Sequence, residues 1–263
     1  MSMVGRLDVT MVAARRPDLV DLTLRSFRLN LLDALDAPHL ILNIDPVWGT
    51  SADDQEVEAV CRRYFQSVEV RRPEQPCFGG AVKWAWGRVQ TDWFLHLEDD
   101  WLLARRIDTE GLAERMADPD LGQIKLSNKS RYRRLKGRLR RGRKRPEMIA
   151  TSPSIIRSSF ARVAVAFMNP DLDPEKQFYQ GFNPAGAAAL ERFGSRVYGN
   201  LLTPCLLYDT GRVWRQVRGM KKRVVDGQSV WEETERKRAS QSYVFQQRAM
   251  ETRLLRSRHR PAV

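Results

Sequence analysis

The sequence predicts an α/β fold, with a mainly parallel sheet flanked by helices and a single domain carrying a basic insertion and a basic C-terminal tail. Short β-rich apolar runs alternate with segments of helical spacing, and acidic residues directly follow two of these runs. The chain has 263 residues, of which 42% are hydrophobic, enough for one sizeable core. No apolar run reaches the roughly 18–20 residues that a membrane-spanning helix needs.

Strands are expected where apolar residues cluster between turn residues. The first covers residues 7–13 (LDVTMVA) and precedes the turn Arg15-Arg16-Pro17-Asp18. The second, residues 40–44, ends at Asp45-Pro46. Further strands are expected at residues 68–70, 93–97 and 122–126.

Helices are expected between these strands. Leu19, Leu22, Leu24 and Phe27 give an apolar side to the segment after the first turn. The other helices are expected at residues 52–65, 78–89 and 109–116. Ligands of doubly wound sheets bind at the carboxyl ends of the strands, so Asp45 and the run Glu98-Asp99-Asp100 are expected on one rim.

Positive charge is concentrated in two segments. The net charge is +13, yet residues 129–145 contain 11 Lys or Arg and no acid, and residues 212–263 carry +9, which leaves −7 for the remainder. We expect residues 128–147 to form a loop, or a helix that orders on contact, and the asymmetry predicts a polyanionic partner. The three cysteines, far apart in the sequence, suggest neither a zinc site nor a disulfide framework, and a cytoplasmic location is expected.

Three consecutive acids follow a buried strand and precede Trp101-Leu102-Leu103. Carboxylates at a strand end suit a hard divalent cation, which can hold a sugar diphosphate and neutralise the charge that develops as it leaves. A solvated acidic turn is the alternative, and the apolar residues on both sides favour the metal site.

The succession of the first strand, LILNID, the Gly79-Gly80 helix and WFLHLEDDW resembles glycosyltransferases of the GT-A fold, family 2-like members in particular. The resemblance implies that Glu98 and Asp99 contact a nucleotide sugar and that Asp100, with Glu98, binds Mn²⁺ or Mg²⁺. Glu98 stands where the family often has Asp. Asp45 would face the nucleotide base, and Lys83 would contact substrate unless it is a solvated helix lysine. A UDP-sugar is the favoured donor.

Two later segments resemble the same family. Glu175, with Asp173 as second choice, would be the general base that an inverting transfer needs, the alternative being an exposed loop acid. Asp209 would complete the metal shell or cap a helix, and Arg212 would reach the diphosphate. The resemblance divides the chain into a nucleotide-sugar-binding half, a basic loop, an acceptor-side half and a basic extension, at residues 1–127, 128–147, 148–218 and 219–263.

The acceptor is predicted from the basic loop, whose Arg-rich, Gly-punctuated sequence is typical of nucleic-acid contacts. We hypothesise a hydroxymethylated pyrimidine in DNA, in resemblance to the DNA-modifying glycosyltransferases of bacteriophages. Two alternatives stay open: a transferase of cell-surface glycan at an anionic membrane, and a non-catalytic nucleic-acid-binding protein. The residues predicted to bind nucleic acid are Arg131, Arg133, Arg134, Lys136, Arg138, Arg140 and Arg141.

Overall fold

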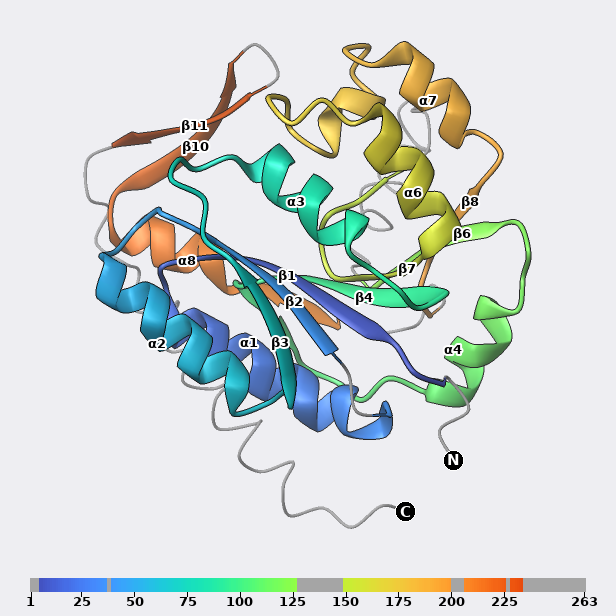
Figure 1. The fold of residues 1–263 in the computed structure, drawn as a ribbon, viewed down its shortest axis with the longest axis horizontal. Helices are drawn as coiled ribbons and strands as arrows, with labels where there is room; N and C mark the ends of the chain where they lie inside the picture. The colour runs from blue at the N-terminus through green and yellow to red at the C-terminus, as the bar shows by residue number, and fades with distance from the viewer. Residues whose placement is uncertain (1–4, 37–38, 127–148, 200–205, 226–227, 234–263) are drawn as a thin grey trace, which may run out of the picture.

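The protein folds around one seven-stranded sheet with helices on both faces (Figure 1). The computed structural model describes residues 5–36, 39–126, 149–199, 206–225 and 228–233. Across the sheet the strands are, in spatial order, β3 (Ser67–Arg71), β2 (His39–Asp45), β1 (Asp8–Ala14), β4 (Trp93–Glu98), β7 (Ser154–Arg157), β6 (Leu121–Lys125) and β8 (Gly194–Val197). The predicted α/β class with a mainly parallel sheet is confirmed.

The central strands run in the same direction. β1 is parallel to β2 and β4, and Ala14 pairs with Asp45 while Val12 pairs with Glu98. The carboxyl ends of these strands therefore share one edge, here called the carboxyl rim, which holds Asp45 and residues 98–100. The expectation that these acids lie on one rim is confirmed.

β7 reverses direction within the sheet, being antiparallel to both β4 and β6. β6 therefore runs parallel to β4, and its last residues also lie at the carboxyl rim. The sequence analysis did not predict β7, β8, or the helix α6 (Ser158–Phe167) that follows β7 directly.

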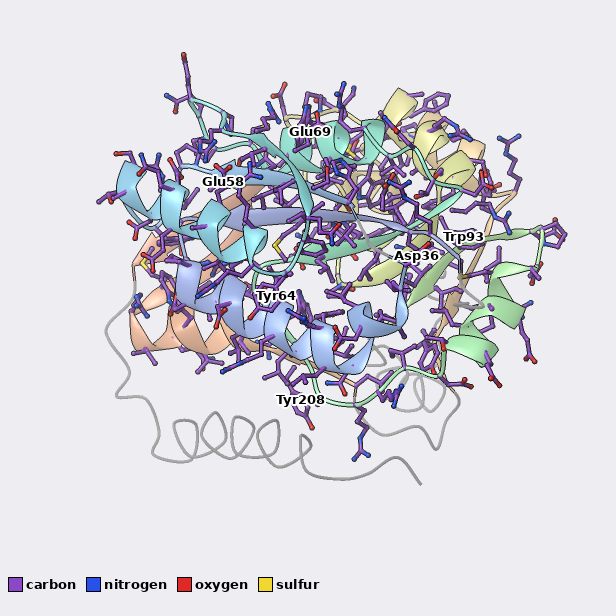
Figure 2. All side chains as sticks on the ribbon, turned by 60° about the horizontal axis from the view of Figure 1, so that its bottom comes forward. Asp36, Glu58, Tyr64, Glu69, Trp93 and Tyr208 are labelled. Carbon is purple, nitrogen blue, oxygen red and sulfur yellow. The ribbon has the colours of Figure 1, made fainter. Side chains whose placement is uncertain are left out.

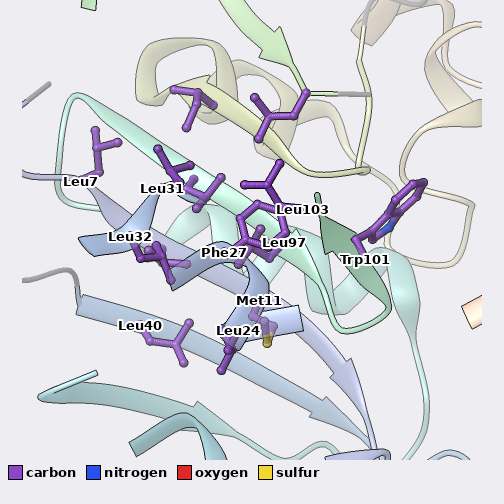
Figure 3. Close-up of a cluster of buried hydrophobic side chains, with 14 of the residues drawn as sticks. Leu7, Met11, Leu24, Phe27, Leu31, Leu32, Leu40, Leu97, Trp101 and Leu103 are labelled. Atoms are coloured by element: carbon purple, nitrogen blue, oxygen red, sulfur yellow. The ribbon is translucent and has the colours of Figure 1, made fainter. Parts of the chain in front are cut away.

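Within the described part of the chain, three helices cover each face of the sheet. The helices α1 (Pro17–Asn30), α2 (Ser51–Arg62) and α4 (Thr109–Met116) cover one face, and α3 (Phe78–Gly87), α6 and α7 (Pro184–Leu190) cover the other. Figure 3 shows the first core, where Leu24 and Phe27 of α1 pack with Met11, Leu40 and Leu97. Burial of each apolar side chain of this size stabilises the folded state by about 1.5–3 kcal/mol relative to leaving it exposed.

Local sequence explains where these helices begin. Pro17 stands in the first turn of α1, where its missing N–H is harmless. Thr50 and Asp53 form a capping box at α2. The hydroxyl of Tyr64, just beyond α2 and labelled in Figure 2, donates to a side chain of α1. Its acceptor is Asp21, at 2.9 Å, and this bond ties the two helices together.

A smaller sheet lies beside the carboxyl rim. β5 (Trp101–Leu103) pairs antiparallel with β9 (Leu207–Asp209), and α8 (Thr210–Val217) follows at once. Beyond α8, the hairpin of β10 (Met220–Val225) and β11 (Gln228–Glu233) lies apart from the main sheet (Figure 1). Two 3₁₀ turns complete the described chain, η1 (Leu32–Ala34) and η2 (Lys176–Phe178). Within the described residues, no helix has the length and apolar character to cross a membrane.

Candidate functional site

The acidic run forms a turn that is fixed through its backbone. Thr23 of α1 donates its hydroxyl to the Asp99 carbonyl at 2.7 Å and accepts the Trp101 N–H at 3.2 Å. The Thr210 N–H donates to the Asp100 carbonyl at 2.9 Å. The turn is thus held between α1 and α8, two helices far apart in sequence.

Asp99 faces the loop between β1 and α1. Its carboxylate accepts the Ala14 N–H at 3.0 Å and two hydrogen bonds from Arg16, Nε at 3.1 Å and Nη2 at 2.5 Å. Both side chains are almost fully buried. Burial alone would lower the pKa of Arg16, but the carboxylates of Asp99 and Asp100 outweigh it and the pKa is raised. Asp99, predicted to contact the donor, holds Arg16 in this structure.

Asp100 lies between two arginines. Its Oδ2 accepts from Arg16 Nη2 at 3.2 Å and from Arg215 Nη1 at 3.2 Å. Burial, reinforced by the charge of Asp99, raises the pKa of Asp100 to about 6 despite these two cations. The Asp100 carboxylate is therefore a costly buried charge, which an approaching cation would stabilise.

Asp209 lies on the other side of Arg215. It ends β9 and caps α8 by accepting the Arg212 N–H at 2.8 Å, so the helix cap that was the alternative to a metal ligand is present. Its Oδ1 is 3.7 Å from Arg215 Nη2. Gly211 allows this packing: a Cβ there would fall 1.8 Å from Asp100 Oδ2.

The predicted metal ligands can be compared with this arrangement. Glu98 accepts the Trp101 indole N–H at 2.7 Å. Among the described residues, no three His, Cys, Asp or Glu side chains form a metal-holding group, so the predicted trio of Glu98, Asp100 and Asp209 is not gathered. Mg²⁺ is often held by only one or two carboxylates together with substrate phosphates. Asp100 and Asp209, with a guanidinium already between them, suit such a cation.

Asp45 closes β2 on the same rim. It accepts from the Asn43 amide at 2.8 Å and from the backbone of Cys77. Burial raises its pKa, although these hydrogen bonds and the charge of Arg71 oppose the shift. Arg71 itself donates to Asn43 Oδ1 at 3.2 Å. The buried acid predicted to face a nucleotide base is thus placed beside hydrogen-bonding groups of β2 and β3.

Two tryptophans meet next to the acidic turn. Trp48, in the loop after β2, contacts Trp214 of α8 edge to face with ring centroids 5.7 Å apart. Trp48 has a φ of 72°, a strained value for a bulky residue. The guanidiniums of Arg16 and Arg218 lie 5.2 and 3.8 Å from the Trp214 ring. Arg16 therefore links the aromatic pair to the acids.

The two predicted cationic contacts lie in different surroundings. Lys83 donates to the Met168 carbonyl at 2.8 Å, which joins α3 to the end of α6. Arg212 is largely exposed, and its Nε lies 3.6 Å from Asp209 Oδ2. Arg212 thus lies on the rim near the acids, whereas the observed bond of Lys83 is structural.

The loop that holds the predicted general base packs against the start of α3. The Cys77 thiol donates to the Pro170 carbonyl at 3.3 Å, and the same residue's backbone bonds Asp45. Asp173 accepts the N–H groups of Glu175 and Lys176, and the Lys176 ammonium at 2.7 Å. Asp173 is thus used as a cap and in an ion pair, and Glu175 is half-buried in the same loop.

The predicted nucleic-acid contacts lie outside the described residues. They are Arg131, Arg133, Arg134, Lys136, Arg138, Arg140 and Arg141. The described chain does fix where their segment is attached. It leaves after β6 and returns before β7, where Lys125 pairs with Ser154 and Ser154 with His96, next to the end of β4. The segment therefore leaves from the carboxyl-rim end of β6, and the described chain resumes beside Gln123 of β6, whose side chain bonds the backbone of Ala150.

His96 is a core residue, as its place inside a strand predicts. Its Nδ1 lies 2.8 Å from the Thr10 hydroxyl and accepts the Trp86 indole N–H at 3.1 Å. Complete burial lowers its pKa to about 3, so the ring is neutral at physiological pH.

No protein-family model and no curated protein sequence matches this chain. Solved structures match its fold. A mannosyltransferase from Pyrobaculum calidifontis, PcManGT in complex with GDP-Man and Mn²⁺, gives a TM-score of 0.52 at 11% identity, over 76% of this chain and 57% of that one. The chain has the GT-A fold. TarS from S. aureus gives a TM-score of 0.51 at 11% identity, over 78% of this chain and 37% of TarS. The chain therefore matches less than two thirds of the length of either protein.

The candidate site at the carboxyl rim contains three residues that the sequence analysis did not single out for function: Arg16, Arg215 and Gly211. Only Arg16 had a readable signal, since two arginines directly after a buried strand and before Pro17 stand where strand-end ligand groups occur. Arg215 and Gly211 depend on β9 pairing with β5, which brings residues about 110 positions apart together.

Proposed function

We propose that this protein is a glycosyltransferase that moves a sugar from a nucleotide sugar to a hydroxyl group of an acceptor. The placement of the acidic turn supports this most strongly. This chain has a GT-A fold, and at its carboxyl rim the buried carboxylates of Asp99 and Asp100 lie between Arg16 and Arg215. Guanidinium groups at the carboxyl ends of parallel strands suit a diphosphate. The nucleotide-sugar donor, with a UDP-sugar favoured, is placed along this rim.

Each rim residue has a proposed role. Asp45 faces the base, and Arg212 binds the diphosphate with the planar donor fork that suits phosphate oxygens. Asp99 and Glu98 act near the donor, Asp99 by holding Arg16. Lys83 contributes by positioning α3 through Met168.

Asp100 and Asp209 would hold Mn²⁺ or Mg²⁺ together with the diphosphate, whereas Glu98, predicted as a further ligand, is not gathered with them. When bound, the metal would supply positive charge that stabilises the leaving diphosphate. PcManGT was solved with Mn²⁺ and GDP-Man, which supports the proposal by analogy of fold.

The transfer itself is a substitution at the anomeric carbon. A base takes the proton of the acceptor hydroxyl, its oxygen forms a bond to the anomeric carbon, and the bond to the diphosphate breaks with the electron pair leaving on the diphosphate. Glu175 is the proposed base. Asp173 is the less suited of the pair because its carboxylate already accepts three hydrogen bonds.

The proposed acceptor is a hydroxymethylated pyrimidine in DNA. The 11 cations at residues 129–145 would bind the phosphate backbone, and the departure of their segment from the carboxyl-rim end of β6 supports a place near the donor. The extruded base or an exposed major-groove group would present its hydroxyl to the site.

The test incubates the full chain with a panel of nucleotide sugars and Mn²⁺, against hydroxymethylated duplex DNA and against anionic vesicles carrying glycolipid. A gain in DNA mass by one hexose is expected, with loss in Asp100→Ala and steep weakening of DNA binding by salt. Transfer to glycolipid but not to DNA would contradict the proposed DNA acceptor. Unchanged DNA binding after deletion of residues 129–145 would also contradict the proposed DNA acceptor. DNA binding with neither transfer nor hydrolysis of any nucleotide sugar would favour a non-catalytic protein.

A further inference from the structure

Arg215 bridges the two carboxylates that the proposed metal site requires. Its Nη1 is 3.2 Å from Asp100 Oδ2 and its Nη2 is 3.7 Å from Asp209 Oδ1. Both acids also have partners other than Arg215: the Asp100 backbone accepts the Thr210 N–H, its carboxylate accepts from Arg16, and Asp209 caps α8. A cationic group therefore already stands between two fixed carboxylates.

The two arginines of the turn differ in how firmly they are held. The Arg16 side chain is 7% exposed and bidentate to Asp99, and it also lies against Trp214. The Arg215 side chain is 20% exposed, lies closer to the solvent, and reaches Asp100 and Asp209 through different nitrogens, bidentate to neither. Of the two, Arg215 is the side chain that can swing away without opening the core.

Charge balance matches this difference. Asp99, Asp100 and Asp209 carry −3, which the two less exposed arginines, Arg16 and Arg215, reduce to −1. Arg212 also lies 3.6 Å from Asp209, but its side chain is 63% exposed and its charge is screened by solvent. If Arg215 turns away, these aspartates with Arg16 carry −2, the charge that one divalent cation neutralises. A metal and Arg215 together would instead place three positive charges around two carboxylates, at short range and in a partly buried site where repulsion is strong.

We propose that Arg215 is an exchangeable internal cation, which holds Asp100 and Asp209 until a divalent metal replaces it and which then binds the donor diphosphate. This inference rests on the proposed function and deepens it. Metal alone must displace Arg215 from its carboxylates. Metal together with a diphosphate gives Arg215 a new anionic partner, so the two ligands favour each other's binding.

The test measures Mn²⁺ binding to the full chain by calorimetry, first without nucleotide and then with UDP or GDP. In Arg215→Gln, Mn²⁺ alone should bind about tenfold more tightly than in the wild type, since a charged hydrogen-bonding competitor is gone. Added nucleoside diphosphate should tighten Mn²⁺ binding clearly in the wild type and much less in Arg215→Gln. Arg215→Lys keeps the charge, and its Mn²⁺ affinity should lie between those of the wild type and Arg215→Gln.

Arg218→Gln is the matched control. It removes the same charge near the end of the same helix, but the Arg218 guanidinium lies over Trp214 and the described contacts show no ion pair between it and either acid. Its Mn²⁺ affinity should stay within about twofold of the wild type, as expected for a more distant, screened charge. Thermal unfolding of each variant would show that the fold is intact.

Equal or weaker Mn²⁺ binding in Arg215→Gln, or an equal gain in Arg218→Gln, would overturn the exchange. Absence of Mn²⁺ binding in every variant would overturn it too, and in that case nucleotide binding or sugar transfer in EDTA would show that the proposed transferase function survives. Failure to bind or turn over any nucleotide sugar would instead remove the function on which the inference rests.

Discussion

Charged side chains have different partners at the two ends of the central parallel strands. At the edge where β1 and β4 begin, Asp8 accepts the N–H groups of Gln90 and Thr91, at 2.7 and 3.1 Å. Arg157 donates to three backbone carbonyls and lies over the Trp93 ring, 4.4 Å from its centroid (Trp93 is labelled in Figure 2). These two charged side chains are satisfied by hydrogen bonds to the backbone, and they join neighbouring segments of the chain.

At the carboxyl rim, charges are paired mainly with charges. Asp99 and Asp100 face Arg16 and Arg215, in a partly dehydrated place where charges are costly to hold. A stable fold needs backbone-satisfied charges such as those of the opposite edge, whereas buried charge pairs are weak contributors to stability. The difference supports the proposal that the carboxyl rim binds a charged ligand, and substitutions at the two ends of the strands should separate function from stability.

The largest effect is expected from Asp100→Asn. This change removes one of two proposed metal carboxylates, and sugar transfer should fall by about 1000-fold, comparable to the loss of one preorganised electrostatic group. Initial rates at saturating Mn²⁺ would measure it. Asp8→Asn at the opposite edge should lower the melting temperature but leave turnover per folded molecule unchanged. Retention of more than a tenth of the activity in Asp100→Asn would remove Asp100 from the site.

Arg16→Met should lower the free energy of unfolding by about 3–5 kcal/mol, because Asp99 would remain buried without its partner. Combining it with Asp99→Leu should recover most of that loss, since an apolar pair replaces the ion pair. Urea unfolding of the single and double variants measures this coupling. Arg157→Met should cost about 2–3 kcal/mol and leave nucleotide affinity unchanged. Additive losses in the double variant would contradict the buried pair.

Gly211→Ala should disturb the rim locally. The new Cβ would fall 1.8 Å from Asp100 Oδ2 and push that carboxylate out of place. Mn²⁺ affinity in the presence of UDP should fall about 10- to 100-fold, the size of a loss from misplacing a positioned group. Gly87→Ala is a matched control, because its Cβ would meet only Val165 Cγ1 at an ordinary 3.9 Å. Equal metal affinities in both variants would show that Asp100 can move without consequence.

The smallest effect concerns pH and His96. Its pKa falls from 6.5 in the unfolded chain to about 3 in the folded one, so the unfolded state binds more protons between these values. His96 therefore contributes stability above pH 6.5 that is lost as pH falls toward 3, roughly 2 kcal/mol by pH 5. The raised pKa of Asp100 acts in the opposite direction, because the folded state binds its proton between pH 3.8 and about 6.

Comparison of the wild type with His96→Gln separates these two groups. The Gln side chain can still accept the Trp86 indole N–H, but it does not titrate. The unfolding free energy of the variant, measured in urea from pH 7 to 4, should decline less steeply than that of the wild type. Identical slopes would mean that His96 is not buried as a neutral ring.

The sequence predicted the first half of the fold because its signals there are local. β-Rich runs, Pro17 and the alternation of strands and helices specify elements that neighbour each other in the chain, and Asp45 and residues 98–100 share a rim by the rules of parallel sheets. The helix cap at Asp209 was one of two readings considered, and it is present.

The rest depends on contacts across long separations in sequence. β7 enters the sheet antiparallel after residues 127–148, and no periodicity specifies this reversal. Arg215 reaches Asp100 only because β9 pairs with β5, and Gly211 is required only by that approach. The sequence analysis therefore found the acids of the site but not the cations that hold them.

The central claim, that the carboxyl rim is a donor site, is tested most directly by calorimetric titration of UDP and GDP into the wild type and Asp100→Asn, each with and without Mn²⁺. The account predicts that at least one of these nucleotides binds the wild type, more tightly with Mn²⁺, and that Asp100→Asn loses the Mn²⁺-dependent part. Binding that is the same in both proteins under all conditions would contradict it.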